Sequence, residues 1–154
     1  KKVGMMYHRS ILKGSADGIK TLITARKRYP NLKAVLFGAA RRPNDLPEWI
    51  EYEHYPGQKE LVERIYNEIS IFLWPALSEG APAPPAEAMA CGCALVSTSC
   101  TGIDEYAEDG KTELLSDDDL RIEIARAGHE NIRRFTWERS TDLLEKVISE
   151  RSVI

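Results

Sequence analysis

The sequence lacks the features by which several classes of protein are recognised. None of its apolar runs approaches the about 20 residues that cross a bilayer, and its first residues do not have the pattern of a signal peptide. It also lacks an excess of basic residues, because 21 Lys and Arg face 24 Asp and Glu, for a net charge of −3. Since the basic residues are spread along the chain, the sequence predicts no transmembrane segment and no nucleic-acid partner.

Cysteine and histidine are scarce, with three of each. Cys91 and Cys93 are too close for a Cys-x-x-Cys metal clip, and no His lies near them in the sequence. The odd number of cysteines and the small residues around them favour buried, reduced thiols in a cytosolic protein. The acids at 117–119 would point in different directions on a helix, so they are predicted to begin a helix rather than to bind a metal. We therefore expect no metal and no other cofactor.

Familiar catalytic motifs are missing as well. No Ser-His-Asp or Cys-His arrangement can be recognised, and neither a Gly-x-Gly-x-x-Gly nor a phosphate-loop motif occurs. His8 has no acid near it in the sequence, which is typical of a polar loop residue rather than of a general base. Function has to be inferred from where the remaining polar residues lie in the fold.

Short apolar runs alternate with helical patterns along the chain, which is typical of a parallel sheet covered by helices. The expected strands are 2–7, 32–38, 49–55, 69–74, 94–98 and 112–115. The expected helices are 15–28, 58–67, 85–91, 118–135 and 136–149, with one helical turn at 102–106. We therefore predict an α/β fold, a Rossmann-like three-layer α/β/α sandwich with about six parallel strands, formed by residues 1–154 as one domain.

The most informative stretch runs from Glu79 to Gly92. Two acids, Glu79 and Glu87, flank a turn rich in Gly and Pro that follows a strand and begins a helix. Open α/β sheets bind their ligands at the carboxyl ends of their strands. A helix N-terminus attracts phosphate and carboxylates accept hydrogen bonds from sugar hydroxyls, so this stretch predicts a nucleotide-sugar site. Glu87 alone would also fit a charge in the first turn of the helix, but Glu79 lies outside the helix.

Two other loops follow strands. In the first, Gly14 allows close backbone approach, Ser15 is predicted to cap the next helix, and Lys13 either reaches a phosphate or is a solvated loop lysine. Arg9 in the same loop is a second candidate cation. In the second loop, 97–102, hydroxyls and glycine amides either face a ligand or satisfy the backbone of the loop.

These residues together resemble a known family. Residues 78–80 and 84–92 are similar to the signature Ser-Glu-Gly-Phe-Gly-Leu-Pro-Pro-Leu-Glu-Ala-Met-Ala-Cys-Gly of the family 4 retaining glycosyltransferases. Further similar stretches follow in the family's order, at residues 3–4 with 13–14, 94–98, 101–110 and 135–138. The resemblance covers nearly the whole chain.

The resemblance implies the C-terminal, donor-binding domain of a two-domain GT-B enzyme. The chain is then expected to be a fragment, without the N-terminal domain through which a glycan or lipid-linked acceptor would bind. Such enzymes transfer a sugar, here a hexose, from a nucleotide diphosphate with retention of configuration and without a metal. We expect a role in polysaccharide biosynthesis, in the cytoplasm or at the inner face of the membrane through the missing part.

The resemblance also assigns roles by position. Glu87 would bind the ribose hydroxyls, and Glu79 would contact the hydroxyls of the donor sugar. Lys13 would face the diphosphate and stabilise the charge of the leaving group, so Glu79 and Lys13 are the expected catalytic residues. The other expected donor-binding residues are Gly80, Ala83, Arg9, Gly14, Thr101 and Gly102.

The chain departs from the family pattern in three places. Where the family has Phe-Gly-Leu, this chain has Ala81, Pro82 and Ala83, and Pro82 has no N–H for the diphosphate. The family's Arg in the first strand is Met5 here, and a Ser before the signature is Ala76. The isolated domain is therefore expected to bind donor and to transfer little. The alternatives are a non-catalytic nucleotide-sugar-binding domain of the same fold and a GT-B nucleotide-sugar epimerase.

Overall fold

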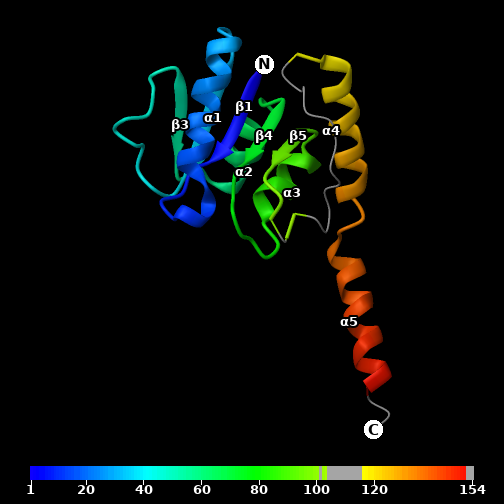
Figure 1. Cartoon of the computed structure of the whole chain (residues 1–154). Helices are drawn as coiled ribbons and strands as arrows, with labels where there is room; N and C mark the ends of the chain where they lie inside the picture. The colour runs from blue at the N-terminus through cyan, green and yellow to red at the C-terminus, as the bar shows by residue number, and fades with distance from the viewer. Residues whose placement is uncertain (101, 104–115, 152–154) are drawn as a thin grey trace.

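In a computed structural model, which describes residues 1–100, 102–103 and 116–151, the chain forms a parallel α/β domain (Figure 1). The described strands are β1 (Lys2–Met6), β2 (Lys33–Gly38), β3 (Ile50–His54), β4 (Ile71–Trp74) and β5 (Ala94–Ser97). All pairs are parallel, in the order β3-β2-β1-β4-β5. This confirms the Rossmann-like α/β prediction, while the expected strand at 112–115 lies outside the described residues.

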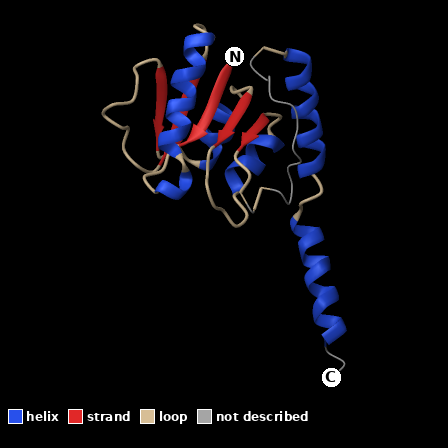
Figure 2. Cartoon of the chain, in the orientation of Figure 1, coloured by secondary structure: helices blue, strands red, loops and turns tan. Residues whose placement is uncertain are grey.

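The described residues also form seven helical segments, which connect or follow these strands; helices and strands are distinguished by colour in Figure 2. They are η1 (Ile11–Lys13), α1 (Ser15–Arg28), α2 (Gln58–Glu60), η2 (Leu61–Tyr66), α3 (Ala83–Ala90), α4 (Asp118–Ile132) and α5 (Trp137–Arg151). The single helix expected at 58–67 is a short α-helical turn followed by the π-helical turn η2. The boundary between the last two helices is set by Thr136, whose Oγ1 accepts the Arg139 N–H at 3.2 Å.

The sheet is buried on both faces, as parallel sheets generally are. In β4, Ile71 and Leu73 join a core with α1 and α4, while Phe72 and Trp74 join a core with η2 and α3. Because successive side chains of a strand point to opposite faces, one short apolar run supplies both cores.

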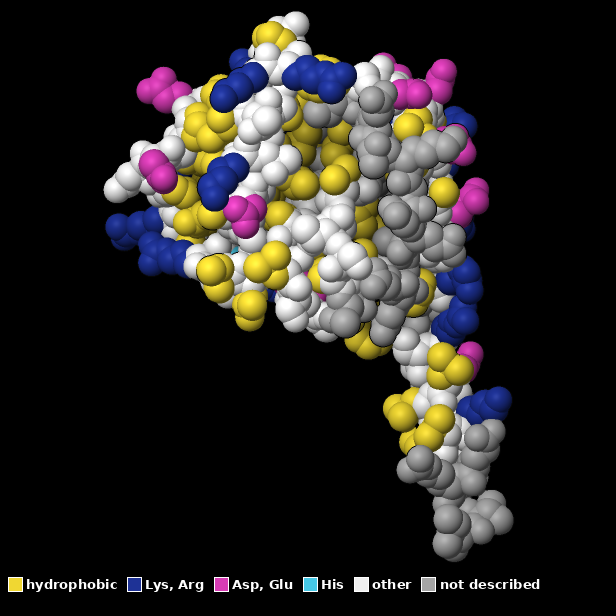
Figure 3. All heavy atoms as spheres, viewed as in Figure 1, with side chains coloured by type: hydrophobic (Ala, Val, Ile, Leu, Met, Phe, Trp, Pro, Cys, Tyr) yellow, Lys and Arg dark blue, Asp and Glu magenta, His cyan; other side chains and the backbone are white. Residues whose placement is uncertain are grey.

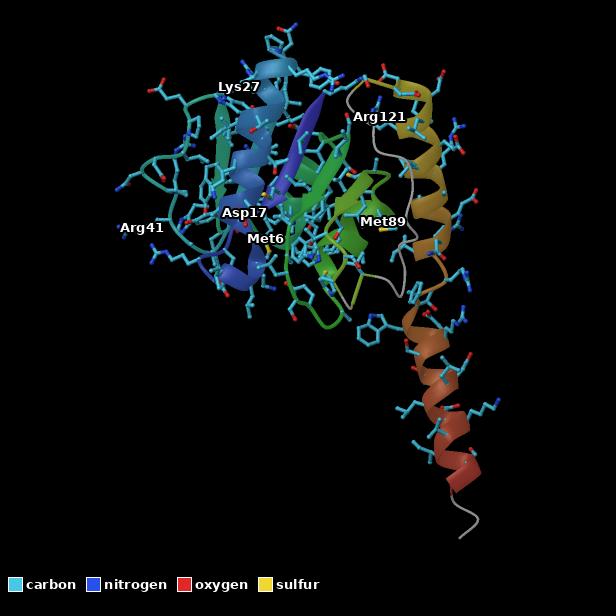
Figure 4. The ribbon with its side chains drawn as sticks, in the orientation of Figure 1. Met6, Asp17, Lys27, Arg41, Met89 and Arg121 are labelled. Atoms are coloured by element: carbon cyan, nitrogen blue, oxygen red, sulfur yellow. The ribbon has the colours of Figure 1, made fainter. Side chains whose placement is uncertain are left out.

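The carboxyl ends of the parallel strands share one edge of the sheet. Met6 at the end of β1 and Asp17 in the first turn of α1 lie at this edge, and Lys27 lies at the other end of α1 (Figure 4). Two loops at this edge are joined directly, because the Leu77 N–H donates to the Leu12 carbonyl at 2.8 Å. The loops after β1 and β4 are thereby held side by side.

The last helix differs from the rest of the domain. Helix α5 extends away from the sheet, and apolar side chains lie exposed along it (Figures 1 and 3). Within the described residues, no helix combines the length and the apolar character that a membrane span requires.

Candidate functional site

The candidate site lies where the connections of the sheet change direction. From β1 the chain moves through α1 to β2 on one side, and β4 pairs with β1 on the other side. Ligands of open α/β sheets bind at such a switch point, outside the carboxyl ends of the strands. Lys13 follows β1 and Glu79 follows β4, so these two predicted residues lie on opposite sides of the switch point.

Lys13 and Glu79 form an ion pair across this point. The Lys13 Nζ donates to Glu79 Oε1 at 2.6 Å, and the side chains are 29% and 11% exposed respectively. The same Nζ lies 5.6 Å from the centroid of the Trp74 ring, which is buried. An ammonium group has three N–H donors, so Lys13 can hold Glu79 and still donate to a phosphate. The two residues expected to be catalytic are therefore brought together.

The backbone beneath this pair requires glycine at position 14. Gly14 has φ 62°, in the left-handed region, and a Cβ there would overlap the carbonyl oxygen of Pro75. The loop after β1 can therefore lie directly on the loop after β4. This close approach brings Lys13 within reach of Glu79.

The roles predicted for Ser15 and His8 differ in their outcome. The prediction that Ser15 caps α1 is wrong, because Gly14 is the N-cap and Ser15 Oγ instead accepts the His8 N–H at 2.9 Å. His8 accepts the Ser10 N–H on Nδ1 at 3.0 Å, which confirms a polar loop role. Both side chains fix the course of the loop that carries Lys13.

Arg9 is not held at the site. Its side chain is exposed and forms no hydrogen bond or ion pair with another described residue. Its charge acts on Tyr52, where it opposes the rise in the pKa of Tyr52 that burial causes. The expected donor-binding role of Arg9 stays a prediction.

The N-terminus of α3 offers few backbone donors. The helix begins at Ala83, two residues before the expected start, because Pro82 has extended backbone angles and serves as the N-cap. The next two positions are Pro84 and Pro85, which fit a first turn because N–H groups there have no partner within the helix. Ala83 is consequently the one residue among the first three helical positions with an N–H.

Gly80 and Gly102, both predicted donor-binding residues, meet at this end of the sheet. A Cβ at position 102 would overlap the Gly80 carbonyl, so the loop after β5 lies directly on the turn before α3. Gly80 itself is exposed, and a Cβ added to it would contact nothing. The turn is therefore open to a ligand at Gly80. Thr101, predicted with them, lies outside the described residues.

The hydroxyls of Ser97, the last residue of β5, and of the following Thr98 donate hydrogen bonds to the backbone. Thr98 Oγ1 donates to the Ala76 carbonyl, and Ser97 Oγ donates to the Thr98 carbonyl at 2.7 Å. Of the two alternatives for this loop, satisfaction of the backbone holds for these two side chains.

Glu87 lies beside the turn, on α3, and is bound by two neutral donors. Tyr66 donates its hydroxyl to Oε2 at 3.0 Å, and Gln58 donates Nε2 to Oε1 at 3.2 Å. Since α3 begins at Ala83, Glu87 lies beyond the first turn, and the alternative that it is a helix-start charge is wrong. Burial, followed by the Glu87 charge, raises the pKa of Tyr66 far above its ordinary range, so Tyr66 remains a donor.

Three residues of the site were not predicted from the sequence. They are Tyr66, Gln58 and Trp74. The signal that could have found Tyr66 is its place beside the apolar Ile65 in the expected helix 58–67, because a buried tyrosine usually needs a partner for its hydroxyl. The Trp74 indole N–H is shielded from solvent and has no hydrogen-bond partner within the described part of the chain.

The cysteines and the acids at 117–119 do not add to the site. Cys93 and Cys100 are buried, as expected, whereas Cys91 is half-buried. Burial raises the pKa of Cys93 to about 12. Asp117 caps α4 by accepting the Leu120 N–H at 2.8 Å, which confirms the helix-start role. Among the described residues, no three His, Cys, Asp or Glu are grouped so that they could hold a metal.

The chain was compared with models of known protein families, and one of them matches it. The model of the glycosyl transferases group 1 family matches residues 3–132. No curated protein matches the chain in sequence.

Solved structures resemble the chain in fold. One is the C-terminal domain of a group 1 glycosyl transferase, LpcC from Francisella tularensis, with a TM-score of 0.70 at 22% identity over 86% of this chain and 84% of that one. Another is the pneumococcal O-GlcNAc transferase GtfA in complex with UDP and GlcNAc, with a TM-score of 0.73 at 17% identity over 99% of this chain and 36% of that one. A third is sucrose-phosphate synthase from Thermosynechococcus elongatus, with a TM-score of 0.75 at 17% identity over 97% and 46%. The chain thus spans less than half the length of the last two.

Proposed function

The chain belongs to the glycosyl transferases group 1 family, and we propose that it binds a nucleotide-diphosphate sugar as the donor for transfer to a glycan or lipid-linked acceptor. The observation that carries this proposal is the Lys13–Glu79 ion pair of 2.6 Å at the switch point of the sheet. It joins a cation and an acid beside an open glycine turn, which suits a diphosphate attached to a sugar.

The roles that we propose for the residues of the site follow from their charges. When the bond between the sugar and the diphosphate breaks, negative charge develops on the diphosphate. The Lys13 ammonium and the Ala83 N–H would stabilise this charge, which is the electrostatic role that a metal has in other transferases. Glu79, held by Lys13, would accept hydrogen bonds from sugar hydroxyls, and Glu87 would accept them from the ribose.

The relatives support a nucleotide and a sugar as the occupants. The pneumococcal structure holds UDP and GlcNAc, and its fold covers nearly all of this chain. We further propose retention of configuration without a metal, as in family 4, with a hexose as the transferred sugar. A role in polysaccharide biosynthesis, in the cytoplasm or at the inner face of the membrane, completes the proposal.

The activity of the whole enzyme is proposed to need more than this chain. Two of the solved relatives are at least twice as long, and we expect an N-terminal domain to bind the acceptor. The chain alone should bind the donor and transfer little.

A non-catalytic role is the second candidate, and one observation favours it. The first turn of α3 has three prolines in or beside it and retains the Ala83 N–H alone among its first three positions. A diphosphate would then be bound mainly through Lys13. A protein that binds nucleotide sugars and transfers none of them, even with its acceptor domain present, would support this second candidate.

The test is calorimetric titration of the chain with UDP, GDP, ADP and dTDP without added metal. We expect one nucleotide to bind clearly better than the other three, and addition of its sugar to increase affinity. Absence of binding by all four, and by their common sugar conjugates, would overturn the proposal. The Lys20→Ala variant is a matched control for Lys13→Ala, because Lys20 lies on the following helix α1 and also pairs with an acid, Asp17, but its side chain is 76% exposed.

A further inference from the structure

We infer that Tyr66 and Gln58 are positioning residues for Glu87, and that through it they make the site select ribonucleotides over 2′-deoxyribonucleotides. The inference rests on the proposed function, because it needs a nucleotide in the site. Neither residue needs to contact the nucleotide. Their effect is on the direction in which the Glu87 carboxylate presents its oxygens.

The hydrogen bonds occupy one position on each carboxylate oxygen. Tyr66 donates to Glu87 Oε2 at 3.0 Å, and Gln58 donates to Glu87 Oε1 at 3.2 Å. Each carboxylate oxygen has two acceptor positions, so each retains one. Two neighbouring acceptors held in one plane match the two adjacent hydroxyls of a ribose. A 2′-deoxyribose would leave one of these acceptors without a donor, which costs affinity when the site is closed to water.

Tyr66 is the more rigid of the two donors. It is fully buried, and its ring lies edge-on to Phe37 and Phe72 at centroid distances of 5.9 Å and 5.8 Å. It is also the last residue of the π-helical turn η2, where the Asn67 N–H donates to the Val62 carbonyl at 3.1 Å. π-helical turns are rare in proteins and are frequent at functional sites. The direction of the Tyr66 hydroxyl is therefore set by the core and not by solvent.

Gln58 is a weaker support. Its side chain lies on the surface at the start of α2, so water competes for its bond to Glu87. Rotation of the Glu87 carboxylate is then limited mainly by the hydrogen bond from Tyr66. The hydrogen bond from Gln58 favours one of the orientations that Tyr66 allows. This ranking of the two residues is itself testable.

The alternative is that the bond only satisfies a buried hydroxyl. A tyrosine buried in an aromatic core needs an acceptor, and Glu87 would provide one whether or not a nucleotide binds. In that case removal of the hydroxyl would change stability, and it would change the affinity for all nucleotides alike. The two explanations differ in whether the preference for ribose changes.

The experiment compares Tyr66→Phe with the unchanged chain. Affinities are measured by calorimetry for the preferred nucleoside diphosphate and for its 2′-deoxy form. We expect the unchanged chain to prefer the ribonucleotide by about tenfold, from the hydrogen bonds to a charged acceptor. Tyr66→Phe should remove most of this preference by weakening ribonucleotide binding, while 2′-deoxynucleotide binding changes less than about twofold. Gln58→Ala should reduce the preference by a smaller factor.

Two controls accompany the measurement. Tyr29→Phe removes a hydroxyl at the far end of α1 and should leave both affinities unchanged. Addition of Tyr66→Phe to Glu87→Ala should cost no further affinity if Tyr66 acts through Glu87. Thermal unfolding confirms that Tyr66→Phe is folded, which we expect because the ring that packs in the core is retained.

The outcomes separate this inference from the proposed function. If the unchanged chain binds a nucleotide but Tyr66→Phe and Gln58→Ala both keep its preference for ribose, the positioning role is wrong and the proposed function stands. Equal weakening of both nucleotides by Tyr66→Phe would also overturn it. If the unchanged chain binds no nucleotide, the proposed function fails and the inference fails with it.

Discussion

The two acids of the site are held in different ways. Glu79 is paired with the charged Lys13 at 2.6 Å, and we call this pair the phosphate half of the proposed site. Glu87 is bound by the neutral donors Tyr66 and Gln58, and these three residues form the ribose half. The negative charge of a carboxylate beside a cation is balanced by that cation, whereas the charge of a carboxylate held by neutral donors is not balanced. One residue type can thus serve two tasks because of its partners.

The two halves also depend on different parts of the fold. The phosphate half is built from the loops after β1 and β4, which the Leu77–Leu12 hydrogen bond holds together. The ribose half is built from α2, η2 and α3, and of these η2 and α3 pack on one face of the sheet. Changes to loop backbone should therefore affect the first half, and changes to side-chain hydroxyls and amides should affect the second.

The largest effect is expected from Gly14→Ala. Its φ of 62° and the overlap of a Cβ with the Pro75 carbonyl force the two loops apart. We expect the free energy of unfolding to fall by about 3 kcal/mol or more, with loss of nucleotide binding. Urea denaturation measures the change in the free energy of unfolding. Gly80→Ala is the matched control, since a Cβ there contacts nothing, and an equal loss of stability in both variants would contradict the explanation.

The next effect is expected from Lys13→Ala. Removal of the ammonium deprives the diphosphate of its cation and leaves Glu79 without this partner. Affinity for the nucleoside diphosphate should fall by about 30-fold, while affinity for the nucleoside stays the same. Calorimetry with both ligands checks this prediction, and Lys20→Ala should change neither value. Equal losses for nucleoside and nucleotide would place Lys13 away from the phosphates.

Glu79→Gln should have a smaller and more selective effect. The amide keeps the size of the side chain but cannot accept hydrogen bonds on both terminal atoms. We expect affinity for the nucleotide sugar to fall by about tenfold and affinity for the bare nucleotide to change less than about threefold. Competition between the two ligands gives the ratio directly. A larger loss for the bare nucleotide would mean that Glu79 acts mainly on Lys13.

Pro82→Gly should bring a modest gain. The extended backbone at the N-cap of α3, with φ −71° and ψ 124°, is accessible to glycine, and the change adds an N–H. Affinity for the diphosphate should rise by about threefold, with a small loss of stability from the more flexible unfolded chain. Pro43→Gly, in the loop before β3, serves as the control. If affinity is unchanged, the missing amide does not limit binding.

The smallest effect is expected when pH is varied. Burial raises the pKa of Tyr66 above its ordinary value of 10.0, so its hydroxyl stays protonated where a solvated tyrosine would begin to ionise. The preference for ribonucleotide over 2′-deoxynucleotide should therefore stay constant from about pH 7 to about pH 9.5. Because the preference is a ratio, changes in the phosphate half cancel from it. A fall in the ratio within this range would mean that Tyr66 loses its proton.

Several features of the fold could be predicted from the sequence for a physical reason. The apolar runs that became the five strands can be recognised because burial on both faces demands continuous apolar residues, as in β4. The stretch from Glu79 to Glu87 could be placed at the ligand edge because a strand, a glycine turn and a helix occur in that order. Local periodicity and turn chemistry suffice for such features.

Other features could not be predicted because they depend on contacts between distant residues. Lys13 and Glu79 lie 66 positions apart, and their ion pair depends on the pairing of β1 with β4 and on the close approach at Gly14. The start of α3 was predicted at residue 85, whereas the helix begins at Ala83. The prediction failed because three nearby prolines each fit a helix N-terminus.

The sequence by itself determined the order of the strands and helices along the chain, and it pointed to the two acids of the candidate site. Only the tertiary structure decided which partner each acid received: a cation for Glu79, and Tyr66 and Gln58 for Glu87. The reason is that hydrophobic periodicity acts over neighbouring residues, whereas the direction of a side chain such as Tyr66 is set by a π-helical turn and by an aromatic core assembled from several elements.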